Sequence, residues 1–144
     1  MRKLQSITKE NFKQFGTVLE FPADSKETFL ILETEAINGW RLAVFRYTNK
    51  EILELECHPA SKESFEPLSG ITVLVVATHE TPNEYQAFVL DKPVCLGKGI
   101  WHQVLSLTEE AQVKITENLE VESVFYQLEK EIVVRVGENE RKMK

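Results

Sequence analysis

The chain is poor in cysteine and has no long apolar run. Its two cysteines, Cys57 and Cys95, are too few for a disulfide framework. No stretch approaches the roughly 18 consecutive apolar residues of a membrane span. The N-terminal segment also lacks the apolar region of a secretory signal. We therefore expect no membrane association and two free thiols in a reducing cytoplasm.

Basic charge is scarce as well. The 17 Lys and Arg residues are outnumbered by 23 acidic residues, which gives a formal net charge of −6. Such a surface repels phosphate, so no nucleic-acid partner is expected. The length of 144 residues, with 42% hydrophobic and 28% charged residues, is typical of one globular domain. We place this domain at residues 1–137 and take residues 138–144 as a charged flexible tail.

Helical patterns are nearly absent, and one short N-terminal helix is the exception. Thr8 is its expected N-cap, Ile7 and Phe12 would form a hydrophobic staple, and Gly16 fits the position just past the helix end. Phe15 would share the apolar face of Phe12.

After Gly16 the chain breaks into short β-segments separated by turn residues such as Asn38-Gly39 and Ser69-Gly70. The predicted strands are Thr17–Phe21, Thr28–Leu32, Arg41–Tyr47, Glu51–His58, Phe65–Leu68, Ile71–Ala77, Tyr85–Leu90, Gln103–Leu107, Val113–Thr116, Ser123–Glu129 and Ile132–Val136. Many short strands at regular spacing predict an all-β sandwich or small barrel.

The chemistry of the chain is concentrated in two segments. Glu56, His58, Glu63 and Gly70 lie in ELECHPASKESFEPLSG, and His102 lies in GKGIWHQ. Two imidazoles and two carboxylates can enclose one divalent metal inside a small barrel. Glycine turns before each returning strand would bring the two segments together. With mixed nitrogen and oxygen ligands, Ni, Mn, Fe and Zn are all admissible.

A simpler interpretation competes with the metal site. In the strand Glu51–His58, the residues Leu53, Leu55 and Cys57 alternate with Glu54, Glu56 and His58. The leucine face could be the core and the Glu/His face could be solvated. If instead the Glu/His face is inside, the leucine face needs a cover. A second subunit is the simplest one, so we expect a homodimer.

Two neighbours of His102 are weaker candidates for the substrate site. Trp101 would wall a pocket or pack beside the turn, and Gln103 would orient a substrate or face solvent. Cys57 alternates away from His58, which favours a buried inert thiol over a nucleophile.

The two segments resemble the two motifs of the cupin superfamily. His58, Glu63, Gly70, Gly99 and His102 match the pattern, while Glu56 replaces the first histidine and Gly97 replaces a proline. The resemblance implies a cupin-type barrel, a double-stranded β-helix or jelly roll, with one short N-terminal helix. It also implies that the metal ligands and catalytic residues are Glu56, His58, Glu63 and His102.

Within that superfamily the chain is similar to the ureidoglycolate lyase (ureidoglycolate hydrolase) family over most of residues 3–107. The likeness lies in KLQSITKENFKQFGTVLEF, ELECHPASKESFEPLSGITVLVVA and GKGIWHQ. The family splits ureidoglycolate into glyoxylate and urea in purine and allantoin degradation. This chain departs from the family pattern at several positions: Cys57 replaces an Arg, Leu53 a frequent His, Glu63 a Gln and Gln103 a second His, and an Asn-Asn-Gly segment is not recognisable.

Three hypotheses follow. The first is a metal-dependent lyase or hydrolase acting on ureidoglycolate or a related small carboxylate. The second is a non-catalytic cupin that binds a metal or small molecule, with a degenerate substrate site. The third is a structural protein whose Glu/His face is solvated.

Overall fold

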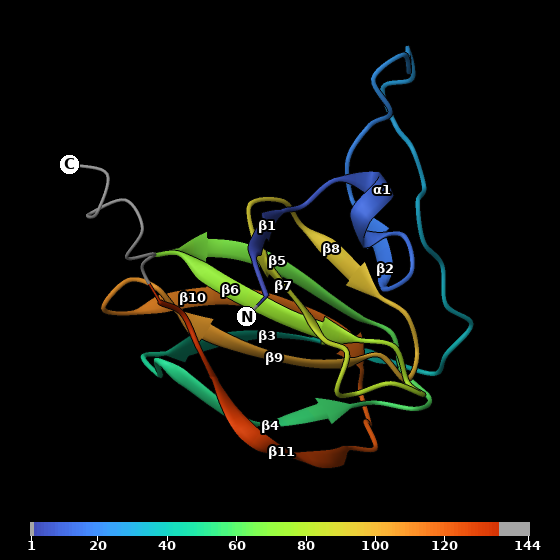
Figure 1. The fold of residues 1–144 in the computed structure, drawn as a ribbon. Helices are drawn as coiled ribbons and strands as arrows, with labels where there is room; N and C mark the ends of the chain where they lie inside the picture. Colours follow the sequence, from blue (N-terminus) through green and yellow to red (C-terminus); the bar gives the residue numbers. More distant parts are fainter. Residues whose placement is uncertain (1, 136–144) are drawn as a thin grey trace, which may run out of the picture.

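The computed structural model describes residues 2–135, which form a β-barrel of two facing sheets (Figure 1). The only helix in this range is α1 (Lys9–Phe12), and none of the described helices is long and apolar enough to cross a membrane. The strands are β1 (Leu4–Ser6), β2 (Gly16–Val18), β3 (Trp40–Tyr47), β4 (Glu51–Cys57), β5 (Glu63–Ser69), β6 (Thr72–Ala77), β7 (Gln86–Val89), β8 (Val94–Leu96), β9 (Trp101–Ser106), β10 (Ala111–Asn118) and β11 (Val124–Val133). The expected all-β barrel with one short N-terminal helix is confirmed.

The barrel consists of two sheets with different numbers of strands. The first has six strands in the order β1-β7-β6-β9-β4-β11, and the second has five in the order β2-β8-β5-β10-β3. All neighbours are antiparallel except the parallel pair β1 and β7. Consecutive strands often lie in different sheets, so chain segments far apart in sequence meet across the barrel.

The main core fills the space between the sheets. Its largest side chains come from both sheets and from the N-terminal segment, and all are nearly inaccessible to solvent: Ile7, Phe12, Phe15, Phe65, Leu74, Phe88 and Leu96. This part of the barrel interior is therefore filled by apolar side chains.

A second apolar cluster covers the outer face of the six-stranded sheet. Leu55 and Cys57 are fully buried there, against Trp101 and Leu105 of β9, with Tyr126 of β11 packed over the cluster. The expectation that a second subunit must cover this face is wrong for Leu55 and Cys57, because the chain's own β11 strand does so. Leu53 alone of the predicted leucine face remains 56% exposed.

The N-terminal helix is shorter than the sequence predicts. Thr8 is the N-cap and forms a capping box with Asn11, as its side chain accepts a hydrogen bond from the Asn11 amide. The helix ends at Phe12, and Gly16 begins β2 instead of closing the helix. A β-carbon at Gly16 would overlap the carbonyl group of Cys95 on β8, which explains the glycine by close strand packing.

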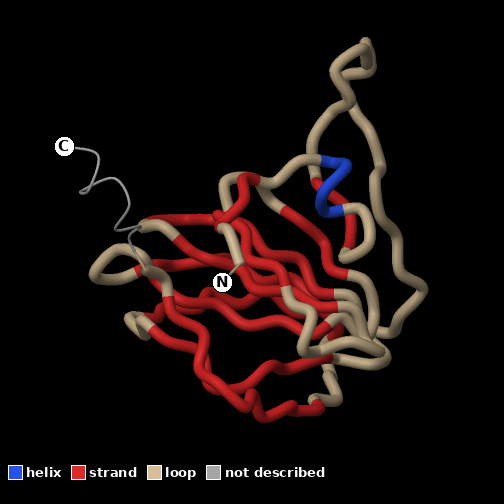
Figure 2. Tube along the Cα trace, in the orientation of Figure 1, coloured by secondary structure: helices blue, strands red, loops and turns tan. Residues whose placement is uncertain are grey.

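Several predicted strands differ from the observed ones. Thr28–Leu32 is not a strand but part of a long loop between Val18 and Trp40, which extends away from the sheets (Figures 1 and 2). The short strands β1 and β8 were not predicted. The last two predicted strands are one strand, β11, with a register shift between Gln127 and Ile132. Val136 and the predicted tail lie outside the described residues.

Gly70 joins β5 to β6 in the left-handed region, at φ 71°. A β-carbon there would overlap the Glu110 carbonyl oxygen and the Thr108 hydroxyl. Replacing Gly70 with Ala is therefore expected to cost about 2 kcal/mol or more of unfolding free energy, from backbone strain and displacement of the neighbouring turn. Chemical denaturation measures the unfolding free energy of the variant and the parent protein. Gly97→Ala is the control, because its β-carbon would meet nothing nearer than 3.8 Å. Equal losses in the two variants would contradict the explanation.

Candidate metal centre

Strand register brings the predicted site residues together inside the barrel. Glu56 on β4 is paired with His102 on β9, and Glu63 on β5 is paired with Glu117 on β10. Residues directly opposite each other point to the same face, so both pairs face the interior. His58 directly follows β4, where Pro59 and the turn to β5 begin. The five side chains therefore come from both sheets and converge in one place.

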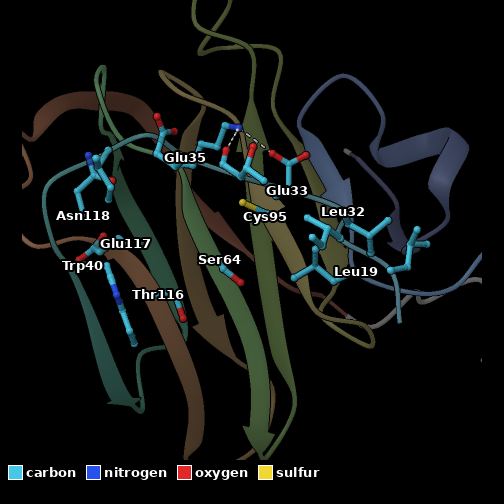
Figure 3. A pocket seen from close by; sticks show the side chains of 15 residues that line it. Leu19, Leu32, Glu33, Glu35, Trp40, Ser64, Cys95, Thr116, Glu117 and Asn118 are labelled. Carbon is cyan, nitrogen blue, oxygen red and sulfur yellow. Dashed lines mark hydrogen bonds and ion pairs between the residues drawn. The ribbon is translucent and has the colours of Figure 1, made fainter. Parts of the chain in front are cut away.

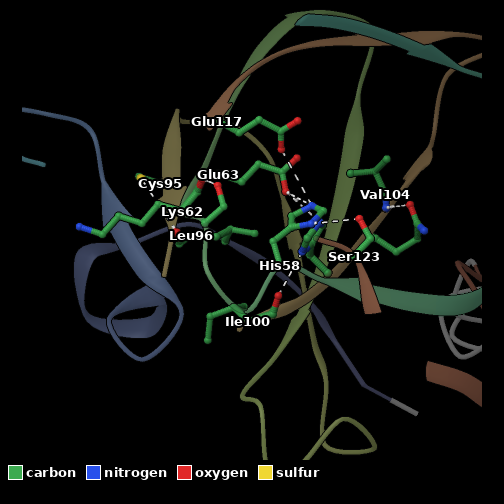
Figure 4. Close-up of polar contacts among 12 residues, drawn as sticks. His58, Lys62, Glu63, Cys95, Leu96, Ile100, Val104, Glu117 and Ser123 are labelled. Atoms are coloured by element: carbon green, nitrogen blue, oxygen red, sulfur yellow. Dashed lines mark hydrogen bonds and ion pairs between the residues drawn. The ribbon is translucent and has the colours of Figure 1, made fainter. Parts of the chain in front are cut away.

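The centre of the cluster is one oxygen of Glu63 (Figure 4). Glu63 Oε1 lies 3.2 Å from His58 Nε2 and 2.9 Å from His102 Nε2. Glu117 Oε1 lies 3.9 Å from His58 Nε2. Glu63 and both histidines are each no more than 6% exposed. This buried arrangement rules out a solvated Glu/His face for these three residues.

Both imidazoles are oriented by their outer nitrogens. His58 Nδ1 lies 3.0 Å from the Glu122 carbonyl oxygen, and His102 Nδ1 lies 3.1 Å from the Ile100 carbonyl oxygen. A carbonyl only accepts, so each Nδ1 carries the proton and each Nε2 points its lone pair inward when the ring is neutral. Metal-binding histidines are oriented in the same way.

Two buried carboxylate oxygens at the centre have no hydrogen-bond donor among residues 2–135 when both imidazoles are neutral, because each Nε2 then carries only a lone pair. They are Glu63 Oε1 and Glu117 Oε1. A buried anionic oxygen without a donor is costly unless a cation balances it. Two inward imidazole nitrogens and two such oxygens are a donor set that fits a divalent cation.

Two overlapping groups of ligand atoms have the spacing of a metal site. One consists of Glu56, His58 and His102, and the other of His58, Glu63 and Glu117, with each group's atoms within 4.8 Å of one another. All four predicted ligands thus lie in the cluster. Glu56 is the half-buried member of the first group.

Glu117 is the residue that sequence reasoning missed. The predicted strand ended at Thr116, one residue before Glu117, whereas β10 continues to Asn118. The signal was present, since the buried residues Ala111 and Val113 alternate along β10 towards Glu117 on the same face. Arg41 of β3 holds Glu117 in place, with its Nε and one terminal nitrogen 2.9 Å and 2.6 Å from Glu117 Oε2.

Burial and interactions within the cluster shift the pKa values of three of its residues. Burial alone would raise the pKa of Glu63, but hydrogen bonds from His102 and His58 bring it down to about 2. The hydrogen bond to Glu63 raises the pKa of His58 to about 9, against the opposing effect of burial. Burial raises the pKa of Glu117, opposed by Arg41 and reinforced by the neighbouring Glu63. Without a metal, the proton on His58 thus balances the Glu63 charge.

Trp101 and Gln103 do not reach the cluster. They alternate with His102 along β9, so they point to the outer face of the sheet. The Trp101 indole donates to the His79 carbonyl oxygen at 2.9 Å and its ring is buried in the outer cluster. Gln103 Oε1 accepts from the Val104 amide. Neither residue faces the interior cluster, and the burial of Trp101 agrees with the packing interpretation.

A separate cavity of about 560 Å³ lies under the long loop, on the outer face of the five-stranded sheet (Figure 3). Ser64, Cys95 and Thr116 form its floor, and Lys62 bridges it to the loop through Glu33 and the Thr34 carbonyl oxygen. Glu117 is the one member of the interior cluster among its described lining residues. The cavity is therefore not the site of the histidine chemistry.

The sequence model of the ureidoglycolate lyase family matches residues 1–132. The chain belongs to this family. The match extends well beyond residues 3–107, where the resemblance was visible by inspection, and it includes Glu117. No curated protein matches the sequence.

Solved structures with a similar fold include variants of oxalate decarboxylase from Bacillus subtilis. One matches with 16% identity and a TM-score of 0.47, over 62% of this chain and 24% of that chain. Another, from work on the Mn(II) centres of that enzyme, matches with 15% identity and a TM-score of 0.46 over the same shares. This chain spans about a quarter of the oxalate decarboxylase length.

The pKa shifts predict how the stability of the metal-free protein depends on pH. The raised pKa of His58 means that its contribution is complete below the ordinary value of 6.5 and is lost as pH rises through about 9. The lowered pKa of Glu63 means that its contribution is complete above 4.5 and is lost as pH falls through about 2. Stability from this pair is therefore greatest between 4.5 and 6.5.

Denaturation of chelator-treated protein at pH 6 and pH 9 tests this expectation. The parent protein should lose stability over that interval, and His58→Gln should lose much less. A parent protein and His58→Gln variant with the same pH dependence would contradict the His58–Glu63 coupling.

Proposed function

We propose that the protein is a divalent-metal-dependent lyase that splits ureidoglycolate, or a closely related small carboxylate, into glyoxylate and urea. The observation that supports it is the buried His58–Glu63–His102 cluster, found inside the barrel of a chain that belongs to the ureidoglycolate lyase family. His58, Glu63, His102 and Glu56 would bind the metal.

The bound metal would polarise the substrate's hydroxyl and carboxylate oxygens as a Lewis acid. The reaction then needs a base for the hydroxyl proton. Glu117 Oε1 suits this role, because it is buried, lacks a hydrogen-bond partner and faces His58. As the hydroxyl proton moves to Glu117, the carbon–oxygen double bond of glyoxylate forms and the carbon–nitrogen bond breaks. The proton then passes to the departing nitrogen, which leaves as urea.

The expected biological setting follows from the family. We place the reaction in the cytoplasm, in the degradation of allantoin and purines. Metal identity among Ni, Mn, Fe and Zn is left to measurement, because mixed nitrogen and oxygen ligands accept all four.

A non-catalytic metal- or small-molecule-binding cupin is the alternative. It is favoured by the absence of a recognisable Asn-Asn-Gly segment ahead of β3, which the family carries and which offers hydrogen-bonding groups to a small substrate. Metal content alone does not separate the two functions, since both bind a metal.

The decisive experiment measures urea and glyoxylate release from ureidoglycolate by protein loaded separately with Ni, Mn, Fe and Zn. The lyase predicts equal amounts of both products, and metal-stripped protein should be inactive. Metal binding without product release would support the binding protein. Absence of metal uptake with all four cations would reject the metal-dependent lyase and the metal-binding protein.

We also propose that the protein forms a homodimer through β3, the edge strand of the five-stranded sheet. Trp40, Leu42 and Val44 share its outer face and are 61%, 55% and 77% exposed. Unpaired apolar edge strands readily pair with another strand. An antiparallel pairing of two β3 strands centred on Ala43 would place Leu42 against Val44 of the second copy. It would also place Arg46 beside the second Trp40, a favourable cation–π arrangement.

Replacing Val44 with Glu is expected to shift the protein from dimer to monomer, because the two-fold axis brings the new charge of each copy to the same apolar contact. Light scattering coupled to size-exclusion chromatography measures the mass. Leu53→Glu is the control, an exposed leucine on β4 in the other sheet. A parent protein that is already monomeric, or a Val44→Glu variant that stays dimeric, would contradict this interface.

A further inference from the structure

A small carboxylate substrate needs a cationic partner. The position of Cys57, where the family carries an arginine, points into the outer apolar cluster and cannot supply one inside the barrel. A divalent metal bound by the two carboxylates of Glu56 and Glu63 would leave little positive charge for a second anion. A basic side chain near the interior cluster is therefore needed.

Most lysines near this end of the barrel are already engaged on its outside. Lys62 pairs with Glu33 at 2.8 Å, Lys98 with Glu35 at 3.2 Å and Lys114 with Glu66 at 3.4 Å. These partners lie on the loop or on the outward face of β5, and none belongs to the interior cluster.

Arg41 is different, because its partner is a member of the cluster. It opposes Glu117 across the β3–β10 ladder and faces the interior with it. Arg41 and His58 approach the two oxygens of one carboxylate: the guanidinium bonds Glu117 Oε2 at 2.6 Å, and His58 Nε2 lies 3.9 Å from Glu117 Oε1. The guanidinium is thus one carboxylate group away from the histidine.

Arg41 also keeps donors that have no partner among residues 2–135. An arginine has five N–H groups, and Glu117 takes only those on Nε and one terminal nitrogen, through a single oxygen. The Arg41 side chain is 45% exposed, whereas that of Glu117 is 7% exposed. The ion pair therefore reaches from the buried centre to the barrel mouth, with its unused N–H groups on the accessible side.

We propose that Arg41, fixed by Glu117, binds the substrate carboxylate and so sets the specificity of the site for small 2-hydroxy and 2-oxo acids. This inference rests on the proposed lyase function. Planar guanidinium groups bind carboxylates through paired, charge-assisted hydrogen bonds. The arrangement would place the substrate's hydroxyl-bearing carbon beside Glu117 and the histidines, with its carboxylate at the mouth.

The test compares parent protein with Arg41→Gln, Arg41→Lys and Lys114→Gln, all loaded with the same metal. Lys114 is the control cation, because it lies on β10, the strand of Glu117, but pairs with Glu66 at 3.4 Å on the outer face, and its side chain is 38% exposed. Ureidoglycolate kinetics give KM and kcat, calorimetry gives glyoxylate affinity, and metal content is measured for each variant. Glycolaldehyde, which lacks the carboxylate, is the uncharged probe.

Arg41→Gln should weaken glyoxylate binding and raise KM by about 10- to 100-fold, with a smaller effect on kcat and an unchanged affinity for glycolaldehyde. Arg41→Lys should recover part of the loss, and Lys114→Gln should match the parent protein. If the parent protein releases both products but Arg41→Gln keeps the KM of Lys114→Gln, the role of Arg41 is refuted while the lyase function stands. A parent protein that neither turns over ureidoglycolate nor binds glyoxylate refutes both.

Discussion

Glu63→Gln is expected to weaken metal binding by more than about 100-fold, beyond the usual cost of losing an outer-shell partner. Glu63 Oε1 is the atom on which the cluster converges, in contact with both imidazole nitrogens. A neutral amide of the same size removes the negative charge. It also places either a weaker acceptor or an N–H donor against two nitrogens whose lone pairs point inward. The substitution therefore changes the chemistry of the centre and preserves its shape.

Competition with a chromophoric chelator measures the affinity, and elemental analysis measures the metal retained on purification. Glu66→Gln is the matched control, because Glu66 lies on the same strand, β5, but faces outward towards Lys114. Its affinity should equal that of the parent protein. Retention of parent-like affinity by Glu63→Gln would mean that the metal, if bound, lies elsewhere.

The sequence motifs indicated which residues would lie together. Glu56 and His58 were assigned to one face by alternation and His102 was expected near them from its glycine turn, and the three lie within one cluster of possible ligands. Alternation likewise shows why Trp101 and Gln103 could not share that face with His102. Where a regular strand carries the residue, spacing alone determines which side of the sheet it occupies.

What the sequence could not show is which distant strands are neighbours. Glu117 and Arg41 meet because β10 pairs with β3, an adjacency between segments about 75 residues apart that no local pattern encodes. The cover of Leu55 and Cys57 depends on the pairing of β11 with β4, which removed the original argument for a second subunit. A different error concerns the apolar run just before Glu33. This run was predicted as the strand Thr28–Leu32, but it lies in the long loop.

The proposed metal ligands and the proposed substrate contact differ in how the sheets constrain them. Glu56, Glu63 and His102 lie on strands with a neighbour on each side, and His58 directly follows one of these strands. Arg41 lies on the edge strand β3, which has a neighbour on one side only.

The packing that supports this centre gives the second large expected effect. Phe88 on β7 is fully buried, and its ring contacts Phe12 and Phe15 edge to face, with centroids 5.2 Å and 5.9 Å away. Phe12 and Phe15 also contact each other, at 5.7 Å. The three rings join the N-terminal segment to the six-stranded sheet. Replacing Phe88 with Ala is expected to lower the free energy of unfolding by about 3–5 kcal/mol, through lost burial and the cavity left behind.

Phe29→Ala is the matched control for this loss. Phe29 lies in the long loop and is 79% exposed, so the same truncation should change stability by no more than about 0.5 kcal/mol. Denaturant titration of both variants gives the difference in their unfolding free energies. If Phe88→Ala fails to fold, Phe88→Leu, which is expected to lose less stability, takes its place in the comparison. Equal stabilities for Phe88→Leu, Phe29→Ala and the parent protein would show that the N-terminal segment is not packed into the core. Val76 and Val104 belong to the same core and lie next to His102 in the sheet. Without the packing of the N-terminal segment, these two valines would no longer fix the position of His102.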